Sequence, residues 1–179
     1  VGDRVRITVE PGAHLIGLWD ASLLRRLVAN LVGNALKYSP ADQPVEIALA
    51  DTIGAGVPSQ VTELVASVRE AVPGVALRCH FHNTRNTGLA NAFPAVQAAV
   101  RTLDASLGAI GGCPFAPAAT GNIPTEDLVY MLQRSGYETG ISLDRAIETG
   151  KWLQEQLGRP VPGMLVKAGG FPQQVVHIA

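Results

Sequence analysis

Apolar and polar positions follow two different periods along the last three quarters of the chain. Short apolar runs bounded by turn residues are typical of buried strands, and apolar positions three or four apart are typical of amphipathic helices. Strands are expected at residues 45–50, 75–82 and 101–107, and helices at residues 59–72, 88–100, 125–135 and 142–157. This alternation predicts an α/β protein of about three βα units with a mainly parallel sheet.

The first 40 residues predict a different arrangement, strand–strand–helix. Residues 3–9 alternate polar and apolar positions, and a Pro-Gly turn separates them from a second short strand at 14–19. Asp20 is suited to cap a helix that runs to about Tyr38 with an apolar stripe along it. The Ser-Pro pair at 39–40 ends this helix.

Helix-end residues sharpen the boundaries of the last two helices. Thr125 is suited to cap the first of them, with Glu126 and Asp127 at the positive end of its dipole. Ser142 is expected to cap the second, and Gly158 to close it. The pattern is weak beyond residue 160, and we expect a partly mobile tail there.

Composition narrows the class of protein. The chain has 179 residues, 47% of them hydrophobic and 16% charged, with a net charge of −1. The composition therefore lacks the excess of basic residues with which proteins bind nucleic acid or anionic lipid. No apolar run approaches the roughly 20 residues of a membrane span, and no signal-peptide pattern opens the chain. Two cysteines, Cys79 and Cys113, form no disulfide framework, so we expect a cytoplasmic protein.

Candidate chemistry gathers at the end of the second predicted strand. His80 and His82 are two positions apart, so their side chains point to one face, where two imidazoles can bind one divalent metal ion. A pair of exposed loop histidines is the alternative. Downstream, Cys113 in a Gly-Gly-Cys-Pro loop and Asn122 after a glycine add a thiol and an amide oxygen. Cys79 points away from the histidines and is expected in the core.

These motifs together resemble 3-hydroxy-3-methylglutaryl-CoA lyase and its metal-dependent relatives, which are (β/α)8 barrels. The resemblance runs from about residue 48 to about residue 170 and covers only the last part of such a barrel, which needs about 250 residues in all. The fold expected is therefore a partial (β/α)8 barrel. The segments that carry the resemblance, in family order and spacing, are Asp51–Pro58, His80–Thr84, Gly88–Asn91, Leu103–Ser106, Gly111–Phe115, Gly121–Asn122 and Thr125–Leu132.

The resemblance implies an activity and a role for each residue. His80, His82 and the side-chain oxygen of Asn122 would bind Mg²⁺ or Mn²⁺ for the retro-Claisen cleavage of a 3-hydroxyacyl-CoA to acetyl-CoA and a keto acid. His80 would thus be both ligand and catalytic residue, with Cys113 moving a proton and Asp51 positioning the substrate. From the residues alone, Cys113 could instead be a small core residue, Asp51 a turn cap and Asn122 a left-handed turn residue.

A second resemblance lies upstream. Residues 30–40, Asn-Leu-Val-Gly-Asn-Ala-Leu-Lys-Tyr-Ser-Pro, are similar to the N-box of sensor histidine kinases, which implies Mg²⁺ binding by Asn34 and phosphate binding by Lys37. An amphipathic helix with a polar face is the alternative. Asp51 is one residue too far from the following glycine for the kinase pattern, and the spacing fits the lyases. We therefore expect a kinase-like segment at residues 1–47 and a lyase-like segment at 48–179.

Departures from the lyase pattern limit the expected activity. No segment matches the Arg-Asp pair with which the family's first strand completes the metal site, and Asn83 stands where the family commonly has aspartate. We expect an impaired lyase, with an ATP-binding kinase fragment and a hybrid chain without activity as the alternatives. An acyl-CoA is the expected partner, and the sheet edges of a partial barrel favour self-association.

Overall fold

The computed structural model of the protein describes residues 45–112 and 121–171, together with part of an N-terminal segment. In that segment the described positions are residues 26, 30–31, 33–35, 37–38 and 40, and all of them except Pro40 are helical. The predicted helix is therefore confirmed at these positions, while the two strands predicted before it lie outside the described residues. The chain divides into two compact units, Val1–Asp104 and Ala105–Ala179.

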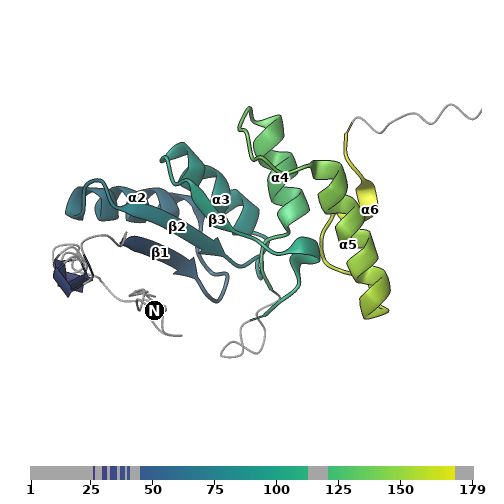
Figure 1. Ribbon diagram of the computed structural model, residues 1–179, viewed down its shortest axis with the longest axis horizontal. Helices are drawn as coiled ribbons and strands as arrows, with labels where there is room; N and C mark the ends of the chain where they lie inside the picture. The colour runs from purple at the N-terminus through teal and green to yellow at the C-terminus, as the bar shows by residue number, and fades with distance from the viewer. Residues whose placement is uncertain are drawn as a thin grey trace, which may run out of the picture. The chain divides into compact units, whose positions relative to one another are not determined.

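The first unit contains a three-stranded parallel sheet in the order β1–β2–β3 (Figure 1). The strands are β1 (Glu46–Asp51), β2 (Ala76–Phe81) and β3 (Thr102–Asp104), and the helices between them are α2 (Pro58–Ala71) and α3 (Gly88–Gln97). This βαβαβ order confirms the predicted alternation. Within the described part of this unit, β1 and β3 each pair with β2 alone, and self-association through these edges stays a prediction.

The two faces of this sheet differ in character. Apolar side chains at alternating positions are buried on one face, and three valines of α2 are buried with them; these residues are Ile47, Leu49, Leu77, Cys79, Phe81, Val61, Val65 and Val68. The intervening positions Glu46, Arg78 and Asp104 are polar and half-buried. One face therefore supplies the core of the unit, and the other carries its charged groups.

Two boundaries in the first unit were predicted too long. The third strand has three residues instead of seven, because the chain leaves the sheet after Asp104 and Ser106 bonds to residues of the second unit. The helix α3 ends at Gln97 instead of Val100. The backbone at Ala99 has a positive φ of 62°, which stops helical continuation.

The described part of the second unit starts with a single turn, η1 (Leu107–Ala109), and continues through three helices. These are α4 (Thr125–Arg134), α5 (Leu143–Leu157) and α6 (Leu165–Ala168). Ser106 and Pro124 form a parallel bridge, in which Ser106 N donates to Ile123 O and Thr125 N donates to Ser106 O, each at 3.0 Å. This bridge brings the start of α4 to the segment that precedes η1.

Two predicted boundaries of α5 are confirmed, and one prediction nearby is wrong. Ser142 accepts a hydrogen bond from Arg145 N, and Gly158 closes the helix with a φ of 61°. Thr125 is not a cap, because the N-cap position is Pro124 and no side chain caps α4 there. After residue 160, Val161 is 1% exposed and the short helix α6 follows it. Residues 172–179 lie outside the described residues, and a partly mobile tail stays a prediction. None of the helices that the structure describes is long and apolar enough to cross a membrane.

Candidate functional site

The histidine pair lies at the carboxyl end of β2. His80 is within the strand, and His82 follows its last residue, Phe81. The ring centroids of the two imidazoles are 5.0 Å apart and their planes are inclined by 58°. His82 is 5% exposed, while His80 is half-buried, so the pair reaches from the interior toward solvent. The prediction that the two side chains share one face is confirmed, and the alternative of two exposed loop histidines is wrong.

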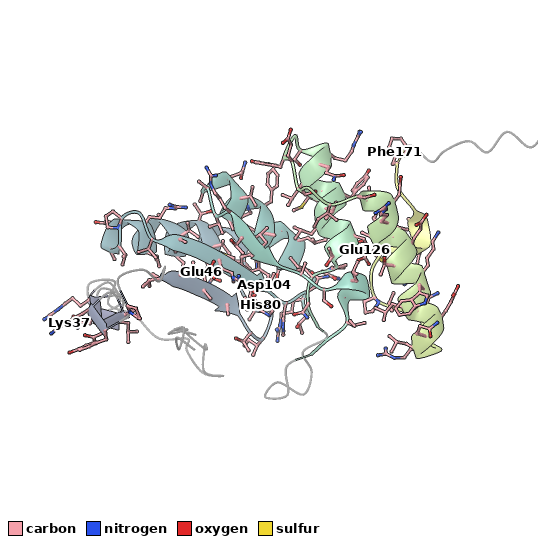
Figure 2. All side chains as sticks on the ribbon, in the orientation of Figure 1. Lys37, Glu46, His80, Asp104, Glu126 and Phe171 are labelled. Carbon is pink, nitrogen blue, oxygen red and sulfur yellow. The ribbon has the colours of Figure 1, made fainter. Side chains whose placement is uncertain are left out.

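A chain of charged side chains runs across the sheet to His80. Glu46 Oε2 of β1 lies 3.0 Å from Arg78 Nε of β2, and Arg78 Nη1 lies 3.4 Å from Asp104 Oδ1 of β3. The other carboxylate oxygen of Asp104 lies 3.6 Å from His80 Nδ1. Figure 2 labels the glutamate, the aspartate and the histidine on the sheet. Neither carboxylate was a predicted site residue, because Asp104 reaches the histidine only through the register of β2 and β3.

Asp51 organises the loop that follows β1. Its carboxylate accepts hydrogen bonds from Ala55 N and Gly56 N, both at 3.0 Å. Because one side chain satisfies two backbone donors of its own loop, the turn-capping interpretation of Asp51 describes its observed contacts. Its part in positioning a substrate stays a prediction.

The same loop is tied to the segment after β2. The guanidinium of Arg85 donates to the carbonyl oxygens of Ile53 and Gly54, at 3.0 and 3.1 Å, and Asn91 Nδ2 donates to Gly56 O at 2.9 Å. Gly54 has a φ of +61°, and a Cβ there would lie 2.7 Å from Thr84 Oγ1. The loop at the carboxyl end of β1 is therefore fixed in shape before any ligand binds.

Asn122 lies in the second unit, where its amide nitrogen donates to Ile110 O at 3.0 Å. The alternative that Asn122 is a left-handed turn residue is wrong. The preceding Gly121 takes the positive φ, 110°, and a Cβ there would collide with the carbonyl oxygen of Gly111. The bond from the amide nitrogen orients the side chain and directs its oxygen away from Ile110.

Two carboxylates of α4 are buried, a feature that the sequence analysis missed. Glu126 is 0% exposed, and each of its oxygens lies 3.1 Å from Gly108 N, which donates to them. Asp127 accepts from Met164 N at 2.9 Å and from Leu165 N at 2.8 Å, and so caps α6. Burial raises the pKa of the Glu126 carboxyl above its ordinary value, and the neighbouring Asp127 raises it further. Their place in the first turn of α4 suggested dipole stabilisation, whereas their partners lie 18 to 38 residues away.

Comparison with known proteins decides the family. The HMGL-like family model matches residues 24–152. The chain belongs to the HMGL-like family. It is 52% identical over 134 residues to (R)-citramalyl-CoA lyase of Chloroflexus aurantiacus, covering 75% of this chain and 42% of that protein. It is 41% identical over 117 residues to hydroxymethylglutaryl-CoA lyase YngG of Bacillus subtilis, covering 65% of this chain and 39% of that protein.

A solved lyase structure agrees with this family assignment. An HMG-CoA lyase from Acinetobacter baumannii in complex with coenzyme A and 3-methylmalate is 43% identical with a TM-score of 0.73, over 83% of this chain and 47% of that one. The chain thus spans less than half the length of these relatives. The predicted fold class, part of a (β/α)8 barrel with parallel strands, is confirmed. The family match begins inside the segment interpreted as kinase-like, and that interpretation stays a prediction.

The structure brings two of the predicted site residues together. His80 and His82 are adjacent in the first unit, and Asn122 belongs to the second unit. Cys113 lies outside the described residues. Asn34 and Lys37 are exposed helical positions, and Lys37 Nζ lies 5.2 Å from the centroid of the Tyr38 ring.

The histidine pair of the first unit fits a divalent cation that accepts nitrogen ligands. Within residues 45–112 and 121–171 and the described helical positions, no three His, Cys, Asp or Glu side chains gather as a metal site. Two adjacent imidazoles nevertheless provide a pair of nitrogen ligands, and an amide oxygen is a ligand type that Mg²⁺ and Mn²⁺ accept. Asn122 of the second unit carries such an amide oxygen, and its part in a metal site stays a prediction.

Proposed function

We propose that the chain forms the carboxyl-terminal part of the active site of a metal-dependent carbon–carbon lyase. Its substrate would be a 3-hydroxyacyl-CoA, cleaved to acetyl-CoA and a keto acid. The observation that carries the proposal is the close pair formed by His80 and His82 at the carboxyl end of a parallel strand. In (β/α)8 barrels this end of the strands holds the catalytic groups.

In this proposal His80 Nε2, an imidazole nitrogen of His82 and the side-chain oxygen of Asn122 hold Mg²⁺ or Mn²⁺. When bound, such a cation acts as a Lewis acid toward the hydroxyl and carbonyl oxygens of a substrate. The low exposure of His82 shields one side of the histidine pair from bulk water, and an imidazole must be neutral to bind a metal ion. The bond from Asn122 to Ile110 O orients the amide so that its oxygen remains the ligating atom.

The reaction requires one proton to leave the 3-hydroxyl group and another to reach the departing carbon. As the C2–C3 bond breaks, its electron pair moves into the thioester as an enolate, and the 3-hydroxyl carbon becomes the carbonyl of the keto acid. We assign the proton transfer to Cys113, following the family resemblance. The fixed loop after β1, held by Asp51, Arg85 and Asn91, would form one wall for the substrate.

The names of the relatives narrow the acyl group. Citramalyl-CoA and 3-hydroxy-3-methylglutaryl-CoA are both 3-hydroxy-3-methyl acyl thioesters that end in a carboxylate. Identity is 52% to the lyase named for the first and 41% to the lyase named for the second. We infer a branched 3-hydroxyacyl-CoA with a terminal carboxylate, and we take (R)-citramalyl-CoA as the first substrate to test.

Manganese binding tests the histidine pair directly. Electron paramagnetic resonance of free Mn²⁺, titrated with the full chain, should show a loss of signal that His80→Ala and His82→Ala each abolish. His177→Ala is the matched control, because it removes another of the four histidines and should leave binding unchanged. Binding that survives both substitutions of the pair would contradict the proposal. Asn34→Ala should have no effect, and a loss of binding there would instead support a nucleotide-type site.

Turnover tests the assignment of the reaction. In a chimera, residues 48–170 would replace the matching segment of the Bacillus subtilis lyase, so that the remaining barrel strands are supplied. We expect metal-dependent release of keto acid from (R)-citramalyl-CoA or 3-hydroxy-3-methylglutaryl-CoA, lost in both His80→Ala and Cys113→Ala. Release that needs no added metal, or that persists in His80→Ala, would refute the proposed function.

A further inference from the structure

We propose that Asp104 is a positioning residue that fixes the tautomer of His80. Its carboxylate would hold the proton of that imidazole on Nδ1 and leave Nε2 as the ligand atom. The inference rests on the proposed function, since it concerns how one histidine of the pair is prepared for a cation. Its observable consequence, the position of one proton, exists without any cation present.

Strand register brings the two side chains together. His80 of β2 and Asp104 of β3 are partners in the parallel ladder, so their side chains leave the same face at the same level. His80 Nδ1 lies 3.6 Å from Asp104 Oδ2, slightly beyond the usual hydrogen-bond range of about 2.7–3.2 Å. Contacts of this kind are often long in a free protein and shorten when the site is filled.

The chemistry of the pair selects one tautomer. An ionised carboxylate only accepts hydrogen bonds, so the ring nitrogen that faces it is favoured as the N–H. That nitrogen is Nδ1, and the lone pair therefore falls on Nε2, on the opposite side of the ring. A carboxylate bound to the far nitrogen of a ligating histidine orients the ring and raises the basicity of the ligand atom.

The carboxylate is itself held in place. Arg78 Nη1 lies 3.4 Å from Asp104 Oδ1, and Arg78 Nε lies 3.0 Å from Glu46 Oε2. Each oxygen of Asp104 therefore has its own neighbour, the guanidinium on one side and the imidazole on the other. On an ordinary solvated face, charged residues of the same types need not contact one another. Here Glu46, Arg78, Asp104 and His80 contact one another in turn across three strands. The series ends at the histidine, and this favours a positioning role.

The tautomer is read directly by nuclear magnetic resonance. Long-range ¹H–¹⁵N correlation spectra of the metal-free chain, recorded at alkaline pH with the imidazole neutral, distinguish Nδ1–H from Nε2–H for each histidine. We expect His80 of the wild-type chain in the Nδ1–H form, and a shift of that population toward Nε2–H in Asp104→Ala. The signals of His82 serve as the internal reference and should keep their pattern.

The matched control is Glu46→Gln, which also removes one carboxylate of the series but does not touch the histidine. It should leave the His80 tautomer unchanged. Asp104→Asn, which keeps the side-chain shape, should lower the Nδ1–H population and replaces the alanine variant if that one does not fold. A wild-type His80 in the Nε2–H form would overturn the proposal without any variant, and so would an Nδ1–H form that persists in Asp104→Ala.

Metal affinity provides the second measurement. Mn²⁺ titration of Asp104→Ala should show affinity lowered by about 10–100-fold, as is typical when the outer partner of a ligating histidine is removed. Glu46→Gln should bind within about twofold of the wild type. Equal affinity in Asp104→Ala and the wild type would count against the proposal. If the wild-type chain binds no Mn²⁺, the proposed function fails, while the spectra still decide the tautomer.

Discussion

Each unit of the chain holds a pair of carboxylates, and the two pairs are satisfied in opposite ways. In the first unit, Glu46 and Asp104 are half-buried and contact side chains, the guanidinium of Arg78 and the imidazole of His80. In the second unit, Glu126 and Asp127 are buried and accept hydrogen bonds from backbone amides. Side-chain partners can be exchanged or moved, whereas backbone partners are fixed by the fold.

This difference distinguishes carboxylates that stabilise the fold from carboxylates that contact the candidate site. A buried carboxyl with a raised pKa is a common mark of a catalytic group. Glu126 has that mark, yet both of its oxygens bond to the Gly108 amide and it holds the turn η1 against α4. Asp104 is half-buried, and its carboxylate is the one that contacts a candidate metal ligand. We therefore expect substitution of Glu126 to change stability, and substitution of Asp104 to change the chemistry of the histidine pair.

The largest effect is expected from Glu126→Ala. The substitution leaves the buried Gly108 N–H without its acceptor and opens a cavity, so the free energy of unfolding should fall by about 3 kcal/mol. Urea denaturation followed by the fluorescence of Trp152 on α5 measures this, in a Trp19→Phe background. Glu148→Ala, at an exposed position of α5, is the control and should change stability by less than about 0.5 kcal/mol. A loss below about 1 kcal/mol for Glu126→Ala would remove the contrast between the two pairs.

Two glycines with similar backbone angles allow the effect of crowding to be measured separately from the effect of backbone strain. Gly108 and Gly158 have φ values of +64° and +61°, but a Cβ at Gly108 would lie 3.0 Å from Val161, while nothing lies within 4 Å at Gly158. Gly158→Ala should lower the free energy of unfolding by about 1 kcal/mol through strain alone. Gly108→Ala should lower it by about 2–3 kcal/mol, because it adds crowding to the same strain. Equal losses would show that the turn η1 adjusts freely, contrary to a rigid second unit.

The free energy of unfolding should depend on pH through the ionisation of Glu126. Its pKa is raised on folding, so between its ordinary value of about 4.5 and the folded value the native state binds more protons than the unfolded state. Stability from this group is therefore present at low pH and lost as pH rises through that window. Glu126→Gln removes this loss, and the difference in unfolding free energy, variant minus wild type, should increase with pH. Urea denaturation across the range from about pH 4 to about pH 8 measures the slope, and a decreasing difference would reverse the assigned direction.

The smallest effect is expected from Arg78→Met in the first unit. Its ion pairs are half-exposed, so the free energy of unfolding should change by less than about 1 kcal/mol. Hydrogen exchange of the β2 amides, compared between variant and wild type, is the measurement. If the β2 amides exchange no faster in the variant than in the wild type, the charged face does not hold the fold together. A fall of more than about 2 kcal/mol in the free energy of unfolding would show that this face, too, is structural.

Local signals predicted much of the fold. The strand β2 and the helices α2 and α5 follow from periodicity, and Ser142 and Gly158 mark the ends of α5 because capping depends on neighbouring residues only. The third strand was overestimated because its continuation bonds to Ile123 instead of to β2. The segment after residue 160 lacks periodicity of its own, and it folds because Asp127 satisfies its backbone from a distance in the sequence.

The candidate site was predictable where the chemistry lies in one strand and the residue that follows it. The spacing of His80 and His82 alone placed both imidazoles on one face. The contact of His80 with Asp104 depends on the register between two strands that are joined by a whole helix, and a single sequence does not specify that register. The buried position of Glu126 likewise depends on the turn at Gly108, 18 residues earlier.

The burial of Cys79 has a consequence for how the first unit can be observed. This thiol is 0% exposed, and its surroundings raise its pKa to about 12, first through desolvation and then through the charge of Asp104. Alkylating and disulfide-exchange reagents attack the thiolate, so Cys79 is inert while β2 is in place. In a Cys113→Ser background it is the chain's remaining cysteine, and the rate at which iodoacetamide labels it reports how often the sheet opens.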